Sequence, residues 1–128
     1  MNILYVEDDP MNRRVVRAML EVGGSAMDEA ESGVLGLEMV GRGDYALVLM
    51  DLRMPGMDGM EAIRHIRARA DDKARVPIIV VTADTAPDLK AACLEAGADD
   101  FLKKPVAMNA LFDAIAQVLS GRDDLATF

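Results

Sequence analysis

The sequence predicts one α/β domain in which a parallel β-sheet is covered by helices on both faces. Five short apolar segments alternate along the chain with segments whose apolar residues recur at helical spacing. The two most apolar segments, residues 46–50 and 78–81, are continuous apolar runs, which is typical of strands buried on both faces of a parallel sheet. The length of 128 residues fits a single domain with a core of its own.

The first strand is expected at residues 3–6, an apolar run that ends at an acidic cluster, residues 7–9. Pro10 suits the first turn of a helix, and Asp9 suits its N-cap. A Gly-Gly pair at residues 23–24 ends that helix. The apolar residues that indicate the helix by their spacing are Met11, Val15, Ala18, Met19 and Val22.

The second strand, residues 26–30, has few β-branched residues and is expected mainly from its position. Ser32 opens a second helix that runs to about Val40. The third strand, residues 46–50, ends at a single carboxylate, Asp51. Proline and glycine then turn the chain at Pro55, Gly56 and Gly59.

Asp58 caps a third helix, residues 59–70, with Ile63 and Ile66 facing inward. The fourth strand, residues 76–82, is the strongest strand signal in the chain and ends at a polar residue. A fourth helix starts near Pro87 and ends at Gly97. Its apolar face consists of Leu89, Ala92, Cys93 and Ala96.

A short fifth strand, residues 98–102, precedes the last helix, which Gly121 is expected to end. We therefore expect one domain over residues 1–121 and a loose tail over residues 122–128. Right-handed crossovers leave few ways to connect five parallel strands. The flavodoxin-like, doubly wound order 2-1-3-4-5 is the expected one.

Composition excludes several classes of protein. The net charge of −8 works against binding a nucleic acid backbone. No apolar run approaches the length of a membrane span, and no basic segment followed by an apolar one opens the chain as a signal peptide would. Cys93 is the only cysteine, so no disulfide framework forms, and a reducing cytoplasm is the expected compartment. We expect Cys93 to be a core residue.

Polar residues follow four of the predicted strands, and the carboxyl ends of parallel strands share one edge of the sheet. These residues are Glu7, Asp8, Asp9, Asp51, Thr82, Lys104 and Pro105. Clustered carboxylates repel one another unless a cation is present, and oxygen ligands alone suit Mg²⁺, with Mn²⁺ as an alternative. A lysine and a hydroxyl suit phosphoryl oxygens, and a carboxylate can form an aspartyl phosphate. The pattern indicates a metal-assisted phosphoryl acceptor.

The chain resembles the receiver domains of two-component response regulators, and the resemblance extends to about Leu119. It is carried by four motifs in the family's order and spacing: Glu7-Asp8, residues 51–59, Thr82-Ala83 and Lys104-Pro105. Each motif alone is weak, but the four together are highly specific.

The resemblance implies a role for each matching residue. Asp51 would be the phosphoryl acceptor. Asp8, Asp51 and the backbone carbonyl of Arg53 would bind the metal directly, and Glu7 would act through a metal-bound water. Asp9 is first a helix cap and only second a ligand, because it precedes Pro10.

On the other strands, Thr82 would hold the phosphoryl group by its hydroxyl, and Lys104 would pair with a phosphoryl oxygen. Ala83, being small, would leave room for that group. Phe101 matches the family's aromatic switch position, and the Lys104–Pro105 bond would be cis. Strand alternation also favours Lys104 over Lys103 as the site residue, because Lys103 falls on the other face.

Other interpretations of these residues stay open. Asp51 could be a carboxylate bonded to a turn, Thr82 could cap a loop, and Phe101 could be core. Arg53 and Asp84 each lie two residues beyond a motif residue and have opposite charges, so they could pair across the mouth of the site or be separately solvated.

The expected function is a single-domain response regulator. Its phosphoryl group would come from a histidine kinase or a histidine phosphotransfer protein. Its output would be a protein contact made by the fourth helix, fifth strand and fifth helix, with no nucleic acid or membrane as partner and a monomeric or weakly dimeric state. It would be no enzyme beyond its own phosphorylation and dephosphorylation. The alternatives are the receiver of a hybrid kinase and a phosphorelay shuttle.

Two rivals come from other classes. A phosphatase resembling the haloacid dehalogenase family also uses an aspartate nucleophile. It needs a second acid two residues later, where this chain has Arg53. A flavin-binding electron carrier shares the fold, but the acids at residues 7–9 would repel the FMN phosphate.

Overall fold

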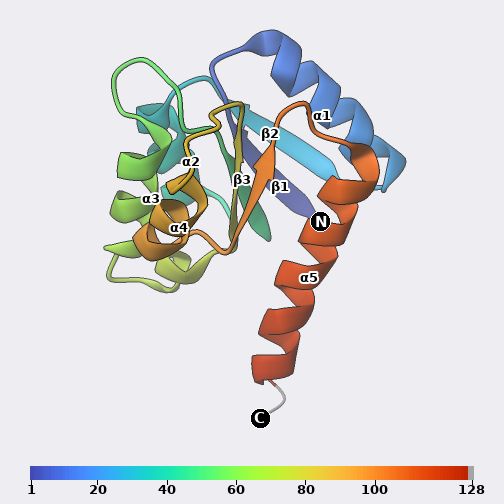
Figure 1. Cartoon of the computed structure of the whole chain (residues 1–128). Helices are drawn as coiled ribbons and strands as arrows, with labels where there is room; N and C mark the ends of the chain where they lie inside the picture. Colours follow the sequence, from blue (N-terminus) through green and yellow to red (C-terminus); the bar gives the residue numbers. More distant parts are fainter. Residues whose placement is uncertain (127–128) are drawn as a thin grey trace.

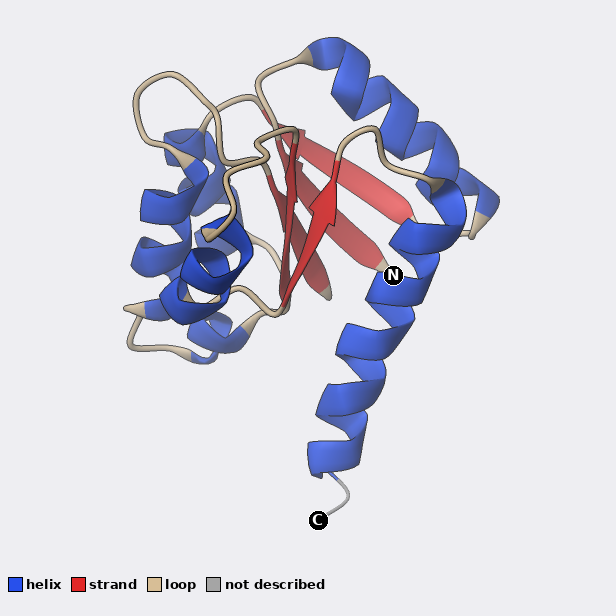
Figure 2. Ribbon diagram, in the orientation of Figure 1, coloured by secondary structure: helices blue, strands red, loops and turns tan. Residues whose placement is uncertain are grey.

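The computed structural model describes the fold of residues 1–126 and the side-chain surroundings of residues 1–121. Its five strands form one parallel sheet in the order β2-β1-β3-β4-β5, flanked by helices on both faces (Figure 1 and Figure 2). The predicted fold class and strand order are therefore confirmed. The elements are β1 Asn2–Val6, α1 Pro10–Val22, β2 Ala26–Ala30, α2 Gly33–Arg42, β3 Leu47–Met50, α3 Gly59–Arg67, the 3₁₀ turn η1 Asp72–Arg75, β4 Ile78–Thr82, α4 Leu89–Ala96, β5 Asp100–Lys103 and α5 Met108–Ala126.

Three helices begin at the caps that the sequence predicts. The Asp9 side chain accepts a hydrogen bond from the Met11 backbone N–H at 2.8 Å, and Pro10 occupies the first turn of α1. Ser32 caps α2 and Asp58 caps α3 in the same way. Each cap satisfies a backbone N–H that the helix itself leaves unpaired, so these starts are determined by local sequence.

The sheet separates two apolar cores. Alternate strand residues such as Leu4 and Val48 face α2, α3 and α4, whereas Ile3 and Leu49 face α1 and α5. Cys93 is fully buried in the first core, as expected, and burial raises the pKa of its thiol. In the described part of the chain, no helix is both long enough and apolar enough to cross a membrane.

The apolar residues that indicate α1 are mostly not the ones that it buries. Val16 and Leu20 are buried, whereas Met11, Val15 and Val22 are 59%, 45% and 72% exposed. Val16 and Leu20 pack into the core beneath α1 and α5, and in this orientation Arg13 and Arg17 both pair with Glu29 of β2. The spacing predicted the helix, but contacts with β2 and the core selected its buried face.

The last helix is longer than predicted. It continues through Gly121 and ends at Ala126, so the expected end at Gly121 is wrong. A glycine inside a helix costs only about 1 kcal/mol relative to alanine, which the continuing helix tolerates. Of the expected tail, residues 122–126 belong to α5 and residues 127–128 lie outside the described residues.

Candidate functional site

The carboxyl ends of β1, β3 and β5 bring together Glu7, Asp8, Asp9, Asp51 and Lys104, whereas Thr82 and Pro105, which were expected at the same edge, do not line the pocket formed there. A pocket of about 250 Å³ opens there. Its lining comes from the β1–α1 loop and α1, from the β3–α3 and β4–α4 loops, and from the end of β5: Glu7, Asp8, Asp9, Asn12, Asp51, Arg53, Ala83 and Lys104. Parallel strands share this edge, so side chains far apart in sequence meet.

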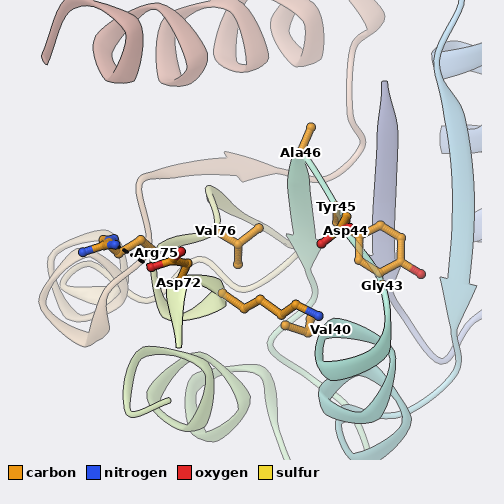
Figure 3. Close-up of a pocket in the computed structure, with 9 residues that line it drawn as sticks. Val40, Gly43, Asp44, Tyr45, Ala46, Asp72, Arg75 and Val76 are labelled. Atoms are coloured by element: carbon orange, nitrogen blue, oxygen red, sulfur yellow. Dashed lines mark hydrogen bonds and ion pairs between the residues drawn. The ribbon is translucent and has the colours of Figure 1, made fainter. Parts of the chain in front are cut away.

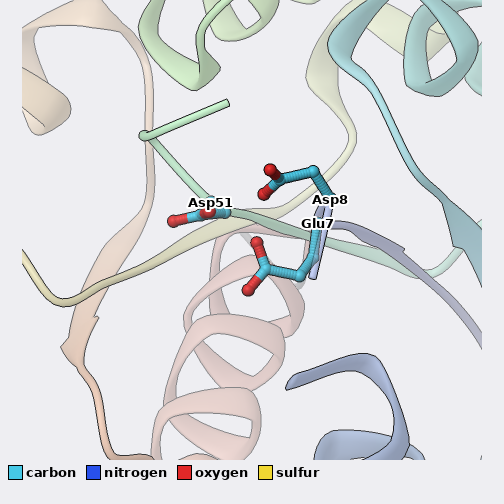
Figure 4. Close-up of side chains that lie close together, drawn as sticks. All are labelled: Glu7, Asp8 and Asp51. Atoms are coloured by element: carbon cyan, nitrogen blue, oxygen red, sulfur yellow. The ribbon is translucent and has the colours of Figure 1, made fainter. Parts of the chain in front are cut away.

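Three carboxylates form the centre of the site. Glu7 is fully buried, Asp51 is 3% exposed and Asp8 is exposed. One oxygen of each lies within 4.8 Å of the others, and Figure 4 shows all three side chains directed toward the same region. Such a group of oxygens repels itself but suits a divalent cation that prefers oxygen ligands. The donor set therefore fits Mg²⁺.

Glu7 is held between several groups. Its Oε1 atom accepts hydrogen bonds from Asn12 Nδ2 and from Lys104 Nζ, both at 2.6 Å. Burial, followed by the neighbouring Asp51 carboxylate, raises the pKa of Glu7 to about 7, although the bonds from Lys104 and Asn12 act in the opposite direction. The metal-free site therefore favours a proton on Glu7, and a bound cation would replace that proton.

Lys104 is the basic residue at the site. Its Nζ atom lies 3.5 Å from Asp51 Oδ1, and its backbone N–H donates to the carbonyl of Thr82 at 2.9 Å. The Lys104–Pro105 peptide bond is cis. Lys103, the other lysine in this segment, is exposed. The ammonium group thus stands beside the carboxylate that the sequence singled out.

The β4–α4 loop contacts itself and Arg53. The Thr82 hydroxyl is buried and accepts a hydrogen bond from the Asp84 backbone N–H at 3.2 Å. Asp84 in turn accepts one from the Ala86 N–H and forms an ion pair with Arg53. The Ala86 bond and the Arg53 guanidinium hold the pKa of Asp84 below its usual range. The sequence left the Arg53–Asp84 pair undecided, and the structure shows that it forms at the mouth of the site.

Phe101 is partly buried against the core that contains α4. It lines a second pocket of about 380 Å³ together with residues of the β4–α4 loop, α4 and β5. The ring therefore lies within reach of the loop that carries Thr82. It is neither fully buried as core nor fully exposed.

Three residues of the site had no clear signal in the sequence. Asn12 bonds the Glu7 side chain, and Arg13 donates to the Glu7 carbonyl at 2.7 Å, so α1 fixes both ends of Glu7. Gly59 was expected only to turn the chain. A Cβ atom there would lie 2.1 Å from the backbone oxygen of Asp51, so α3 can start this close to Asp51 only with glycine.

A larger pocket, about 580 Å³, lies at the opposite edge of the sheet, beside the amino ends of β3 and β4 (Figure 3). Three of its charged side chains, Asp72, Lys73 and Arg75, have partners. Asp72 pairs with Arg75, and Lys73 donates to the Gly41 carbonyl at 2.8 Å. The larger pocket contains none of the clustered acids, so we assign the function to the smaller one.

Comparison with known proteins shows the family to which the chain belongs. A family model described as the response regulator receiver domain matches residues 3–116. The rice two-component response regulator ORR41 is 43% identical over 115 residues, which are 87% of this chain and 88% of that protein. The aerobic respiration control sensor protein ArcB of Escherichia coli K12 is 37% identical over 97% of this chain but only 16% of its own length. Several curated relatives are longer, and the chain spans 16% to 51% of their lengths.

One solved structure similar to this chain contains a metal ion. The receiver domain of the sensor histidine kinase PA1611 from Pseudomonas aeruginosa PAO1, with a magnesium ion coordinated in its active site cleft, superposes with a TM-score of 0.84. It is 36% identical, and the match covers 93% of this chain and 97% of that one.

Proposed function

Because the chain belongs to the response regulator receiver domain family, we propose that it is a signalling domain that accepts a phosphoryl group on Asp51. The observation that carries the proposal is the position of this carboxylate. It is 3% exposed at the end of β3, 3.5 Å from the Lys104 ammonium and beside two further acids. Phosphoryl transfer needs a positioned nucleophile and positive charge for the phosphoryl oxygens, and this edge of the sheet offers the means for both.

In the proposed reaction, an Asp51 oxygen attacks the phosphorus of a phosphohistidine. The oxygen–phosphorus bond forms as the phosphorus–nitrogen bond breaks, and the electron pair stays on the imidazole nitrogen. Lys104 exchanges its bond to Glu7 for one to a phosphoryl oxygen, and the Thr82 hydroxyl donates to another. A bound Mg²⁺ would supply further positive charge for the phosphoryl oxygens.

The residues proposed to hold Mg²⁺ are those that the family resemblance implies. Asp8, Asp51 and the backbone carbonyl of Arg53 would bind it directly, and Glu7 would bind it through a water. The cluster of Glu7, Asp8 and Asp51 supports this assignment, because one oxygen of each carboxylate lies within 4.8 Å of the others. The magnesium ion in the PA1611 receiver, 36% identical to this chain, supports it independently.

The proposed donor is a histidine kinase or a histidine phosphotransfer protein, and the proposed output is a contact with another protein. The rice regulator, which the chain nearly spans, supports a regulator that acts by itself. The sensor protein ArcB, of which the chain spans 16%, supports the alternative of a receiver within a hybrid kinase. Since a single cysteine cannot form a disulfide within the chain, the cytoplasm remains the proposed compartment.

Phosphotransfer profiling tests the function. The purified histidine kinases of the source organism are autophosphorylated one at a time with labelled ATP and mixed with this protein. We expect rapid transfer of label from one or a few kinases. If no kinase or phosphotransfer protein transfers label faster than an unrelated acidic protein acquires it, the proposed role in signalling is wrong.

The Thr82 hydroxyl is proposed to carry the signal away from Asp51. We expect Thr82→Ala to accept a phosphoryl group still, because Asp51 and Lys104 remain. The β4–α4 loop of this variant should respond only weakly to phosphorylation of Asp51. Loss of the hydrogen bond from the Asp84 N–H should lower the free energy of unfolding by about 1 kcal/mol. The measurement is the NMR chemical-shift change in α4 and β5 when beryllofluoride, a phosphoryl mimic, is added.

Thr85→Ala is the matched control, because Thr85 is an exposed threonine of the same loop. It should respond to beryllofluoride as the parent does. Shift changes in α4 and β5 as large in Thr82→Ala as in the parent would show that another residue couples the site to Phe101.

The Arg53–Asp84 ion pair is proposed to restrain the β4–α4 loop. The Arg53 side chain is 77% exposed, so the pair is weak, and Arg53→Ala should speed amide hydrogen exchange at Asp84 and Ala86 up to about fivefold. Asp84→Asn should speed exchange similarly, because it removes the charge that pairs with Arg53. Its side-chain oxygen can still accept the hydrogen bond from the Ala86 N–H, so only the ion pair is lost. Arg64→Ala, at an exposed position of α3, is the control. Unchanged exchange in both test variants would mean that the pair does not restrain the loop.

A further inference from the structure

Two buried side-chain polar atoms in the described part of the chain have no hydrogen-bond partner: Tyr5 Oη and Glu7 Oε2. Both side chains are fully buried. They stand two residues apart along β1 and its continuation, so they project to the same face of the sheet. Buried polar atoms are nearly always paired with protein or ordered water, so two such atoms on neighbouring side chains need an explanation.

The two atoms are chemically complementary. A phenol donates a hydrogen bond, and a carboxylate oxygen accepts one. A tyrosine phenol has an ordinary pKa of about 10 and therefore keeps its proton near neutral pH. The other oxygen of Glu7 already accepts bonds from Asn12 and Lys104. Oε2 is therefore the oxygen still in need of a donor.

The side chains that pack with Tyr5 in the core are apolar. It belongs to the core beneath α1 and α5, together with Val16, Leu20 and Leu111. A tyrosine hydroxyl in such a core loses its hydration, which costs about 1–3 kcal/mol if nothing replaces it. A phenylalanine would fill the same space without that cost, so the hydroxyl calls for a role of its own.

We propose that one buried water bridges the Tyr5 hydroxyl and Glu7 Oε2, and that Tyr5 is thereby a positioning residue for the acidic site. The water accepts from the phenol and donates to the carboxylate. Glu7 is then held on both oxygens, by Lys104 and Asn12 on one and by the water on the other. This inference rests on the proposed metal site, because Glu7 matters there only if the carboxylates hold a cation.

The first test compares Tyr5→Phe with the parent by titration with Mg²⁺ alone, followed by backbone amide NMR shifts. A hydrogen-bond partner of a direct metal ligand typically contributes about tenfold or more to metal affinity. Glu7 acts through a water, so we expect a smaller rise in Kd, about threefold. The Tm of the metal-free variant should not rise, because the hydroxyl has a partner. Tyr45→Phe is the matched control, since the Tyr45 hydroxyl bonds Asp28 outside the acidic site, and it should leave the Kd unchanged.

The second test observes the hydroxyl directly. The chain has only two tyrosines, so protein labelled with ¹³C at tyrosine Cζ gives two signals, which Tyr45→Phe assigns. We expect the Tyr5 signal to move during the Mg²⁺ titration with the midpoint of the amide shifts, and to lose this response in Glu7→Gln. The Tyr45 signal should stay in place.

The outcomes separate this inference from the proposed function. If the parent binds Mg²⁺ and Asp51 is phosphorylated, but Tyr5→Phe keeps the parent's Kd and has a higher Tm, the hydroxyl is unpaired and the inference is overturned. A Tyr5 ¹³C signal that does not move during the Mg²⁺ titration also overturns the inference. If the parent amides near Asp8 do not respond to Mg²⁺ at all, the metal site fails and this inference fails with it.

Discussion

Asp51→Asn should abolish phosphorylation, lowering the amount of label by at least about a hundredfold. The proposed acceptor is a carboxylate oxygen, and an uncharged amide of the same shape is a far weaker nucleophile. Protein is incubated with Mg²⁺ and acetyl phosphate, a small phosphodonor, and its intact mass is measured for the gain of one phosphoryl group. The adduct on the parent should be labile to base and to hydroxylamine, as an acyl phosphate is.

Asp9→Asn is the control for this experiment. Asp9 lines the same pocket, but its carboxylate caps α1 and lies outside the cluster of Glu7, Asp8 and Asp51. That variant should still be labelled. Label of the same lability persisting on Asp51→Asn would contradict the assignment of the acceptor. The variant should fold, and relief of repulsion from Glu7 and Asp8 should raise its metal-free stability by about 1 kcal/mol.

Metal-free stability should fall as the pH rises from about 4.5 to about 7, and Glu7 is the predicted cause. Its pKa is about 7 in the folded protein and 4.5 ordinarily, so the folded state binds more protons within that window. Stability from this group is fully present below pH 4.5 and is lost as the pH rises through 7. The shift corresponds to a loss of up to about 3 kcal/mol.

Urea unfolding at several pH values, with metal removed by a chelator, measures this effect. Glu7→Gln cannot titrate at this position, so the stability difference between it and the parent isolates Glu7 from all other groups. We expect this difference to change by about 2–3 kcal/mol between pH 5 and pH 8. A pH-independent difference would show that Glu7 has an ordinary pKa in the folded protein.

Mg²⁺ should restore the stability that the metal-free protein loses as the pH rises. Because the cation replaces a proton, its stabilising effect on the parent should be larger at pH 8 than at pH 5. Asp8→Ala removes a proposed direct ligand but leaves Glu7 in place, so it should lose most of the Mg²⁺ effect while keeping the pH dependence. If Asp8→Ala binds Mg²⁺ as tightly as the parent, Asp8 is not a ligand.

The exposed side of α1 is a further consequence of the tertiary structure. Met11, Val15 and Val22 recur on a helix that starts directly after the acidic loop, yet all three are at least 45% exposed. The pattern that predicts a helix does not show which apolar residues are buried, because a helix can rotate about its axis without changing the pattern. Here the burial of Val16 and Leu20 in the core sets that rotation, and Arg13 and Arg17 pair with Glu29 in the resulting orientation.

The sequence alone was sufficient to predict the fold class, the strand order and the edge of the sheet at which the candidate site lies. Caps at Asp9, Ser32 and Asp58 act within a few residues of themselves, so local chemistry determined where those helices begin. Asp51 and Lys104 were expected to meet because the carboxyl ends of parallel strands share one edge whatever the details of packing. Their separation of 3.5 Å is a tertiary consequence of that shared edge.

Only the tertiary structure decided which groups contact each candidate residue. Asn12 and Arg13 on Glu7, Gly59 against Asp51, and the complementary pair Tyr5 and Glu7 all depend on distances between elements, which no local pattern contains. The same holds for Arg53 and Asp84, whose charges permitted a pair without requiring one. Patterns along the chain specify which elements form and where capped helices begin, whereas side-chain partners depend on how rigid elements pack in three dimensions.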